Sequence, residues 1–278
     1  MNIPLIAGLA ILAGLILERI VLYFVLNMLR ETGMVGKNYQ GDTIPLSTGI
    51  TFPVAIMPVF LIYELFSCYD SSYSLFLLGI VFISFLGFID DSLGRRDTLG
   101  FRGHFSALFR GKLTTGGLKA VGGGFIAFFL AFFVSDGWLN IILNTLIIAL
   151  AANMLNLLDL RPGRAIKGFF FCLLIVVALA VFAVDPLLIA PLLGIVLAYL
   201  PEDLQAKTMM GDAGSNVLGL ALGFLCIMSL SLLPRIGILI FLIAVHIYTE
   251  RFSLSRTIEN NAVLKAIDQW GRNEFRRL

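Results

Sequence analysis

Long apolar runs, separated by short polar segments, dominate the 278-residue chain. A helix needs about 20 apolar residues to cross a bilayer, because each residue adds about 1.5 Å of rise. On that criterion the sequence predicts about nine membrane-spanning helices, over roughly 4–29, 46–66, 73–89, 116–134, 138–158, 166–184, 186–200, 215–233 and 236–250. The seventh and ninth are short enough to be tilted, half-buried or broken. We therefore expect an all-α, polytopic membrane bundle over residues 1–250.

Residues 251–278 differ from the rest, because charged positions interrupt their apolar ones. The apolar side chains spread along this segment are Phe252, Leu254, Ile258, Val263, Leu264, Ile267 and Trp270. Such a pattern is typical of an amphipathic segment that lies at a membrane surface. We expect a cytoplasmic, interfacial tail.

Lysine and arginine positions predict the orientation of the bundle. If the N-terminus is outside, the inside segments are 30–45, 90–119, 159–167, 201–214 and 251–278, and they hold 18 of the 20 Lys and Arg residues. The positive-inside rule places such loops in the cytoplasm. We expect a multi-pass protein of the cell (plasma or inner) membrane that meets soluble substrates on its cytoplasmic face.

The amino-acid composition excludes several classes of protein. Hydrophobic residues make up 59% of the chain and charged residues 14%, against about 45–50% and about 25% in soluble domains. A soluble enzyme, a disulfide scaffold and a disordered chain are excluded. The net charge of +2 gives no case for a nucleic-acid partner.

Polar side chains interrupt the ends of two predicted spans. Asp90 and Asp91 end the third span, where a charge pair that merely wets the boundary is the plainer interpretation. Asn153, Asn156 and Asp159 end the fifth, and their spacing of three places them near one helix face. Hydrogen bonding between helices would explain them, but an acid beside a basic loop favours a ligand site.

The segment 211–216, Gly-Asp-Ala-Gly-Ser-Asn, precedes the eighth span. It could be a capped turn, or a helix N-terminus that binds phosphate with a cation held by Asp212. Topology favours the second interpretation, because four acids fall at the cytoplasmic ends of spans: Asp90, Asp91, Asp159 and Asp212. Mg²⁺ typically takes a few carboxylates plus substrate phosphates, so we expect a divalent-cation and phosphate site.

These motifs, in this order, resemble those of the polyprenyl-phosphate N-acetylhexosamine-1-phosphate transferases (glycosyltransferase family 4), which include the phospho-MurNAc-pentapeptide translocase. Asp90-Asp91 is similar to the family's aspartate pair, 153–159 to its NxxNxxD motif and 211–215 to its GDxGS motif. The resemblance implies transfer of a sugar-1-phosphate from a UDP-sugar to polyprenyl (undecaprenyl) phosphate, with release of UMP and with Mg²⁺ as cofactor. It also allows a homodimer.

Residue roles follow from the same resemblance. Asp212 would be the principal Mg²⁺ ligand, with Asp91 as a further ligand. Asp90 would orient the lipid phosphate or act as its base, with Asp91 beside it, and Asp159 would join this catalytic set. Asn156 would bind the nucleotide or help to hold the phosphates. Apart from the resemblance, Lys112 is a candidate diphosphate contact, because Gly and Thr donors lie beside it in 110–117, and Arg251 could reach a phosphate. We also expect substrate contacts from Lys37, Asn153, Arg161 and His246. Lys119 is more simply explained as a positive-inside charge.

The sequence also departs from the family pattern. Leu160-Arg161-Pro162-Gly163 follows Asp159 where the family often has a second aspartate motif, and Pro162 occupies that aspartate's position. His246 stands alone where the pentapeptide translocase has three histidines, which argues against the pentapeptide substrate. Two alternatives therefore stay open: a transporter or flippase for a lipid-linked or anionic ligand, and a catalytically altered homologue.

Overall fold

The computed structural model describes residues 2–66, 68, 70–94, 114–181 and 183–272, and these are almost entirely helical. The long helices are α1 (Ile3–Glu31), α2 (Thr51–Leu65), α3 (Ser71–Leu93), α5 (Thr115–Val134), α6 (Trp138–Leu158), α7 (Arg164–Leu179), α8 (Pro186–Leu204), α9 (Asp212–Ser229) and α10 (Leu232–Arg251). Two short helices follow, α11 (Leu254–Asn260) and α12 (Ala262–Gln269). The prediction of an all-α membrane bundle is confirmed.

Eight helices in the described part of the chain are long and apolar enough to cross a membrane. The predicted sixth span corresponds to α7, which ends at Leu179 after 16 residues and is shorter than expected. The predicted seventh and ninth spans are longer, at 19 and 20 residues. The ninth begins earlier than predicted, at Leu232, because Pro234 lies in the first turn of α10, where a proline costs no intrahelical hydrogen bond.

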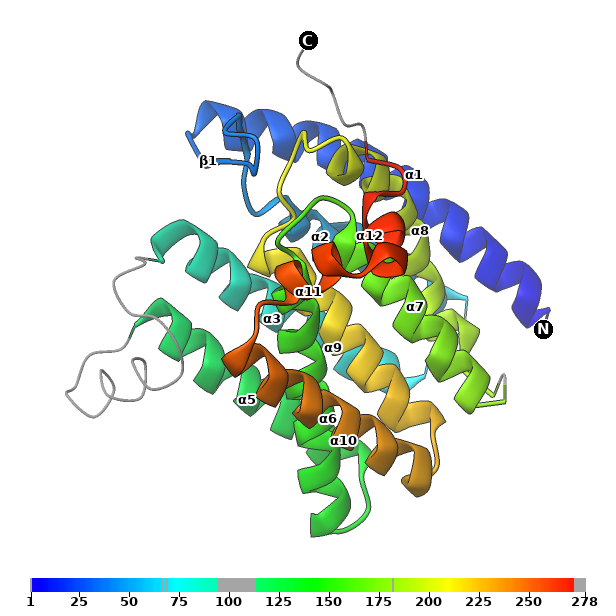
Figure 1. Cartoon of the computed structure of the whole chain (residues 1–278). Coiled ribbons are helices and arrows are strands. Elements are labelled where there is room, and N and C mark those ends of the chain that lie inside the picture. Colours follow the sequence, from blue (N-terminus) through cyan, green and yellow to red (C-terminus); the bar gives the residue numbers. More distant parts are fainter. Residues whose placement is uncertain (1, 67, 69, 95–113, 182, 273–278) are drawn as a thin grey trace.

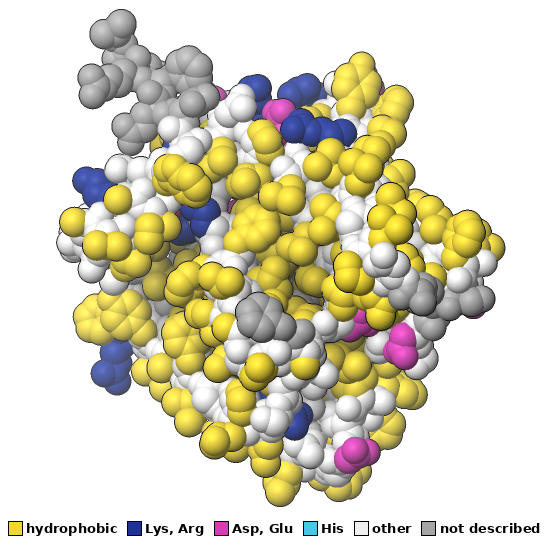
Figure 2. Space-filling model, turned by 90° about the vertical axis from the view of Figure 1, so that its right-hand side faces the viewer, with side chains coloured by type: hydrophobic (Ala, Val, Ile, Leu, Met, Phe, Trp, Pro, Cys, Tyr) yellow, Lys and Arg dark blue, Asp and Glu magenta, His cyan; other side chains and the backbone are white. Residues whose placement is uncertain are grey.

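Helix α9 forms the centre of the bundle, where most of its length is buried, and packs against α3 and α6. Its contact with α6 is close because Gly219 and Gly223 face the α6 backbone, which any added Cβ atom would strike. On one side α1 packs against α8, and on the other α10 packs on α6 with nearly all of its apolar length exposed (Figure 1). Hydrophobic side chains cover most of the face in Figure 2, as expected for a surface that meets lipid.

An antiparallel hairpin joins α1 to α2. Its strands, β1 (Val35–Lys37) and β2 (Thr43–Pro45), pair Gly36 with Ile44. A 3₁₀ turn, η1 (Thr48–Ile50), then leads into α2. The backbone amides of Thr48 and Gly49 donate to the Met209 and Met210 carbonyl oxygens, at 3.1 and 3.0 Å. The first loop is thereby tied to the segment that enters α9.

One end of the bundle collects most of the polar connections. Figure 1 shows the hairpin, the end of α6, the start of α9 and the helices α11 and α12 at this end, with the N-terminus at the far end of α1. This arrangement agrees with the chain reversals assumed in the sequence-based orientation. The assignment of this end to the cytoplasm stays a prediction.

Candidate active site

The end of α3 and the start of α9 meet at close range at this end of the bundle. Gly87, one turn before Asp90, packs directly on the Asp212 backbone, so that a Cβ atom there would overlap it. Gly211 has φ +70°, a conformation that disfavours other residues, and its missing side chain leaves room for the Asp91 carboxylate. Two glycines therefore allow the aspartate pair of α3 to lie beside Asp212.

Lys119, on the second turn of α5, lies between these acids. Its ammonium lies 2.8 Å from Asp90 Oδ2 and also donates to Asp212 Oδ2. About a fifth of each of these side chains is exposed: 21% for Lys119, 18% for Asp90 and 21% for Asp212. Nothing near Lys119 in the sequence distinguishes it from the other basic residues, and only the packing of the helices reveals its place between two carboxylates.

The Asn156 amide completes the same cluster from the end of α6. In the orientation that satisfies its neighbours, its nitrogen donates to Asp212 Oδ1 at 3.0 Å, and its oxygen accepts from Lys119 Nζ at 3.3 Å. Three side-chain oxygens, from Asp90, Asp212 and Asn156, therefore surround one positive charge. We call these three residues and Lys119 the cation cluster.

Asp91 has a different position from its neighbour. Its carboxylate accepts hydrogen bonds from the Asp212 and Ala213 backbone amides, at 3.2 and 3.3 Å. These are the first amides of α9, which have no acceptor within the helix, and the positive end of the helix dipole favours an anion there. Asp91 thus caps α9 from another helix, a role that its sequence position did not indicate.

Asp159 follows the last turn of α6 and is partly buried. Burial raises its pKa well above the usual range, and the nearby carboxylates of Asp203, Asp212 and Asp91 act in the same direction. A hydrogen bond from the Gly211 backbone opposes this rise in pKa. Asp159 therefore contacts the same glycine that makes room for Asp91, and it borders the cation cluster.

Oxygen ligands suit Mg²⁺, and the cation cluster supplies them. The described residues contain no group of three His, Cys, Asp or Glu side chains arranged to hold a metal ion. The donors nevertheless fit a hard cation, because two carboxylates and an amide oxygen already converge on the Lys119 ammonium. Mg²⁺ typically binds one or two protein carboxylates and completes its shell with water and phosphate.

Other predicted contact residues lie apart from the cation cluster. Asn153 is one turn earlier on α6 and Lys37 is exposed on β1, and no hydrogen bond or ion pair in the described chain joins either to the aspartates. Arg161 stacks over the Tyr39 ring at 5.1 Å and lies 3.7 Å from Glu259. Lys112 lies outside the described residues.

Two further candidates lie on α10. His246 Nδ1 is 2.7 Å from the Leu242 carbonyl oxygen, and its Nε2 is buried without a partner in the described structure. Arg251 is the last residue of the helix and is exposed. The structure thus brings Asp90, Asp91, Asn156, Asp159 and Asp212 together. Among the described residues, no hydrogen bond or ion pair joins the predicted basic contacts to them.

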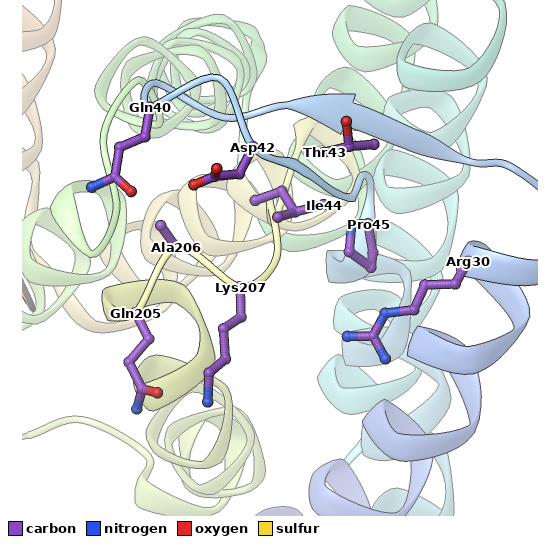
Figure 3. Close-up of a pocket in the computed structure, with 9 residues that line it drawn as sticks. All are labelled: Arg30, Gln40, Asp42, Thr43, Ile44, Pro45, Gln205, Ala206 and Lys207. Atoms are coloured by element: carbon purple, nitrogen blue, oxygen red, sulfur yellow. The ribbon is translucent and has the colours of Figure 1, made fainter. Parts of the chain in front are cut away.

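A cavity of about 710 Å³ opens between the hairpin, the end of α1 and the α8–α9 connection (Figure 3). Arg30 and Lys207 lie on its walls, with Asp42 and Gln40 on the hairpin side. None of the residues of the cation cluster lines it. This cavity is therefore separate from the aspartate site.

The comparison with known families agrees with this geometry. A model described as glycosyl transferase family 4 matches residues 73–230, more than half of the chain. The matched segment contains every residue of the cation cluster, together with Asp91 and Asp159. A search of curated proteins finds no match to this chain. The chain belongs to glycosyl transferase family 4, the family of polyprenyl-phosphate sugar-1-phosphate transferases.

Proposed function

We propose that this protein transfers an N-acetylhexosamine-1-phosphate from a UDP-sugar to polyprenyl (undecaprenyl) phosphate. The products are a polyprenyl-diphosphate-sugar and UMP, and Mg²⁺ is the cofactor. The observation that carries the proposal is the convergence of Asp90, Asp212 and Asn156 on one positive charge, within the family-matched segment and at the polar end of the bundle. The membrane would be the cell membrane, with the site on its cytoplasmic face.

Charge balance supports a divalent cation at this site. Four carboxylates gather here, those of Asp90, Asp91, Asp159 and Asp212, and Lys119 is the one described Lys or Arg that forms an ion pair with any of them. A phosphate-bearing substrate would be repelled by such a site unless more positive charge were present. Mg²⁺ would be held by Asp212 and Asp90, and it would supply charge neutralisation at the diphosphate.

The bond changes follow from the substrates. An oxygen of the lipid phosphate attacks the β-phosphorus of the UDP-sugar. The bond between the β-phosphorus and the bridging oxygen breaks, and that oxygen leaves on the α-phosphate as part of UMP. A phosphate monoester has its second pKa near about 6 and is largely dianionic at neutral pH. The attacking oxygen therefore needs little deprotonation, and Asp90 would help to position it by holding the cation rather than by removing a proton.

The remaining side chains would position and neutralise the reacting groups. The Lys119 ammonium, which lies between Asp90 and Asp212, would contact the transferred phosphate. Asp91 fixes the first turn of α9 and so aims Asp212. Asn156 holds Asp212 Oδ1 through its amide nitrogen, and Asp159 would border the nucleotide. Catalysis would rest on positioning and electrostatics.

The test is UMP release by the purified full-length protein in detergent. The reaction would contain Mg²⁺, undecaprenyl phosphate and a panel of UDP-N-acetylhexosamines. We expect UMP release with at least one donor, dependent on both the lipid phosphate and Mg²⁺. Asp136→Asn, at an exposed turn between α5 and α6, is the matched control and should keep full activity. Absence of UMP with every donor would contradict the proposal.

A further inference from the structure

The two short helices after α10 are held by a buried arginine at the start of α7. Arg164 is only 5% exposed, and its Nε and Nη2 donate to the two oxygens of Asp268 on α12, at 2.8 and 3.0 Å. Its Nη1 donates to Ser255 Oγ on α11 at 2.8 Å. All three guanidinium nitrogens therefore bind the C-terminal segment 254–272, which we call the tail.

The tail also reaches the loop that precedes α7. Arg272 Nε donates to the Pro162 carbonyl oxygen at 2.8 Å, while its Nη2 donates to Asp268 Oδ1 at 2.6 Å. Lys167 Nζ donates to the Asp268 backbone oxygen at 2.7 Å. One carboxylate, 8% exposed, thus joins Arg272, which binds the Pro162 carbonyl oxygen, to Arg164, which follows Gly163 in the chain.

The same loop is also held by α8. The Gly163 amide donates to Asp203 Oδ2 at 2.9 Å, and Asp203 is buried. The short loop 160–163 is therefore held by both α8 and the tail. It follows Asp159 directly, and Asp159 is itself joined to the end of α6 by a hydrogen bond from its amide to the Asn156 carbonyl oxygen at 3.0 Å.

A buried ion pair is a costly way to anchor a tail. Removing two charges from water often costs as much as their attraction returns, so such pairs contribute more to a defined geometry than to stability. Tail helices packed through apolar side chains would anchor equally well. The bidentate contact of Arg164 with Asp268, by contrast, fixes both distance and orientation.

We propose that the tail, through Asp268 and Arg272, is a positioning element of the active site that holds loop 160–163 and thereby Asp159. The expected effect on catalysis rests on the proposed function. The expected effect on structure, which is the coupling of the tail to loop 160–163, does not. Asp268 touches no substrate and is a positioning residue, not a catalytic one.

Four variants of the full-length protein test the coupling. Asp268→Asn removes the charge at constant size, and Asp268→Glu restores it. Arg272→Gln breaks the contact with Pro162 while Asp268 still binds Arg164, so the chain should fold even if Asp268→Asn does not. Lys265→Ala, on the exposed side of the same helix, is the matched control.

Hydrogen exchange of the loop amides, those of Leu160, Arg161 and Gly163, is the first readout, because it needs no turnover; the Gly163 amide donates to Asp203. We expect exchange to be at least about tenfold faster in Asp268→Asn and Arg272→Gln, unchanged in Lys265→Ala, and largely restored in Asp268→Glu. Faster exchange confined to the tail, with the loop amides still protected, would overturn the proposal even if UMP release succeeds.

The second readout is steady-state UMP release. A displacement of a positioned group by about 1 Å can cost about 10²-fold in rate, so we expect kcat to fall about 10- to 100-fold in Asp268→Asn and Arg272→Gln. KM for the UDP-sugar should change less than about threefold, and Asp268→Glu should recover most of kcat. An unchanged kcat in Arg272→Gln would overturn the proposal. If the wild-type protein releases no UMP, the proposed function fails, and the exchange result alone decides the coupling.

Discussion

Replacing Lys119 by methionine would test the cation cluster most incisively. Methionine keeps nearly the length of lysine without its charge, so Asp90 and Asp212 would face each other across an apolar side chain. At a separation on the order of 5 Å and an effective dielectric of about 20, two like charges repel by about 3 kcal/mol. About a fifth of each side chain is exposed, and screening by water reduces this to about 2 kcal/mol.

A bound divalent cation should offset this repulsion. A ligand at about 100 times its Kd stabilises the folded state by about 2.7 kcal/mol, which matches the loss. For a chain of this size, 1 kcal/mol corresponds to about 2–4 °C in Tm. We therefore expect Lys119→Met to lower Tm by about 4–8 °C in EDTA and to regain most of it with saturating Mg²⁺.

The assay is thermal unfolding of the detergent-solubilised protein, followed by far-UV circular dichroism with EDTA or with Mg²⁺. Lys265→Met, an exposed lysine of α12, controls for the loss of one positive charge and should show neither effect. A wild-type Tm in EDTA would refute the bridging role of Lys119. A lowered Tm that Mg²⁺ does not restore would refute a divalent-cation site between Asp90 and Asp212.

Three further predictions concern the surrounding residues. Asp212→Asn should reduce UMP release about 10²- to 10³-fold, because a carboxylate that would hold the Mg²⁺ is lost, while its Tm stays close to that of the wild type; an activity within about tenfold of wild type would contradict this role. Gly87→Ala should lower both Tm and activity, by about 1–3 kcal/mol in stability, because its methyl group would overlap the Asp212 backbone; an unchanged Tm would show that α3 and α9 can separate at no cost. Asp159→Asn should raise Tm, and the rise should be larger at pH 8 than at pH 5. Burial raises the pKa of Asp159 in the folded state, so the wild type loses stability as pH rises from about 4 through that raised pKa. The asparagine cannot ionise and avoids this loss. Tm measured at both pH values checks this, and an Asn variant whose gain is larger at pH 5 would contradict it.

The helices could be predicted from the sequence because a bilayer demands about 20 consecutive apolar residues, and this constraint is visible in any one segment. Their boundaries were less accessible, since they depend on local geometry. Pro234 lies within the first turn of α10, where it is tolerated, and α7 ends at Leu179 before its apolar run does. Hydropathy alone does not distinguish these cases.

The acids of the site could be predicted because each ends or begins an apolar run at the same face. Their partners could not, because contacts between helices decide them. Lys119 resembles any positive-inside lysine until α3, α5 and α9 are packed together. Asp268 lies 104 residues from Arg164, and nothing near either residue indicates their pairing. The sequence likewise described the tail as amphipathic without showing that it holds the loop after Asp159.

The most direct test of the central claim is the fate of the β-phosphate of the UDP-sugar. A donor labelled with ³²P at that phosphate would be incubated with the protein, undecaprenyl phosphate and Mg²⁺, and the lipid and aqueous products separated. Transfer of a sugar-1-phosphate predicts label in the lipid fraction, with one unlabelled UMP formed per labelled lipid, and loss of both in Asp212→Asn. Label recovered as UDP, or no labelled lipid with any UDP-N-acetylhexosamine donor, would contradict the account.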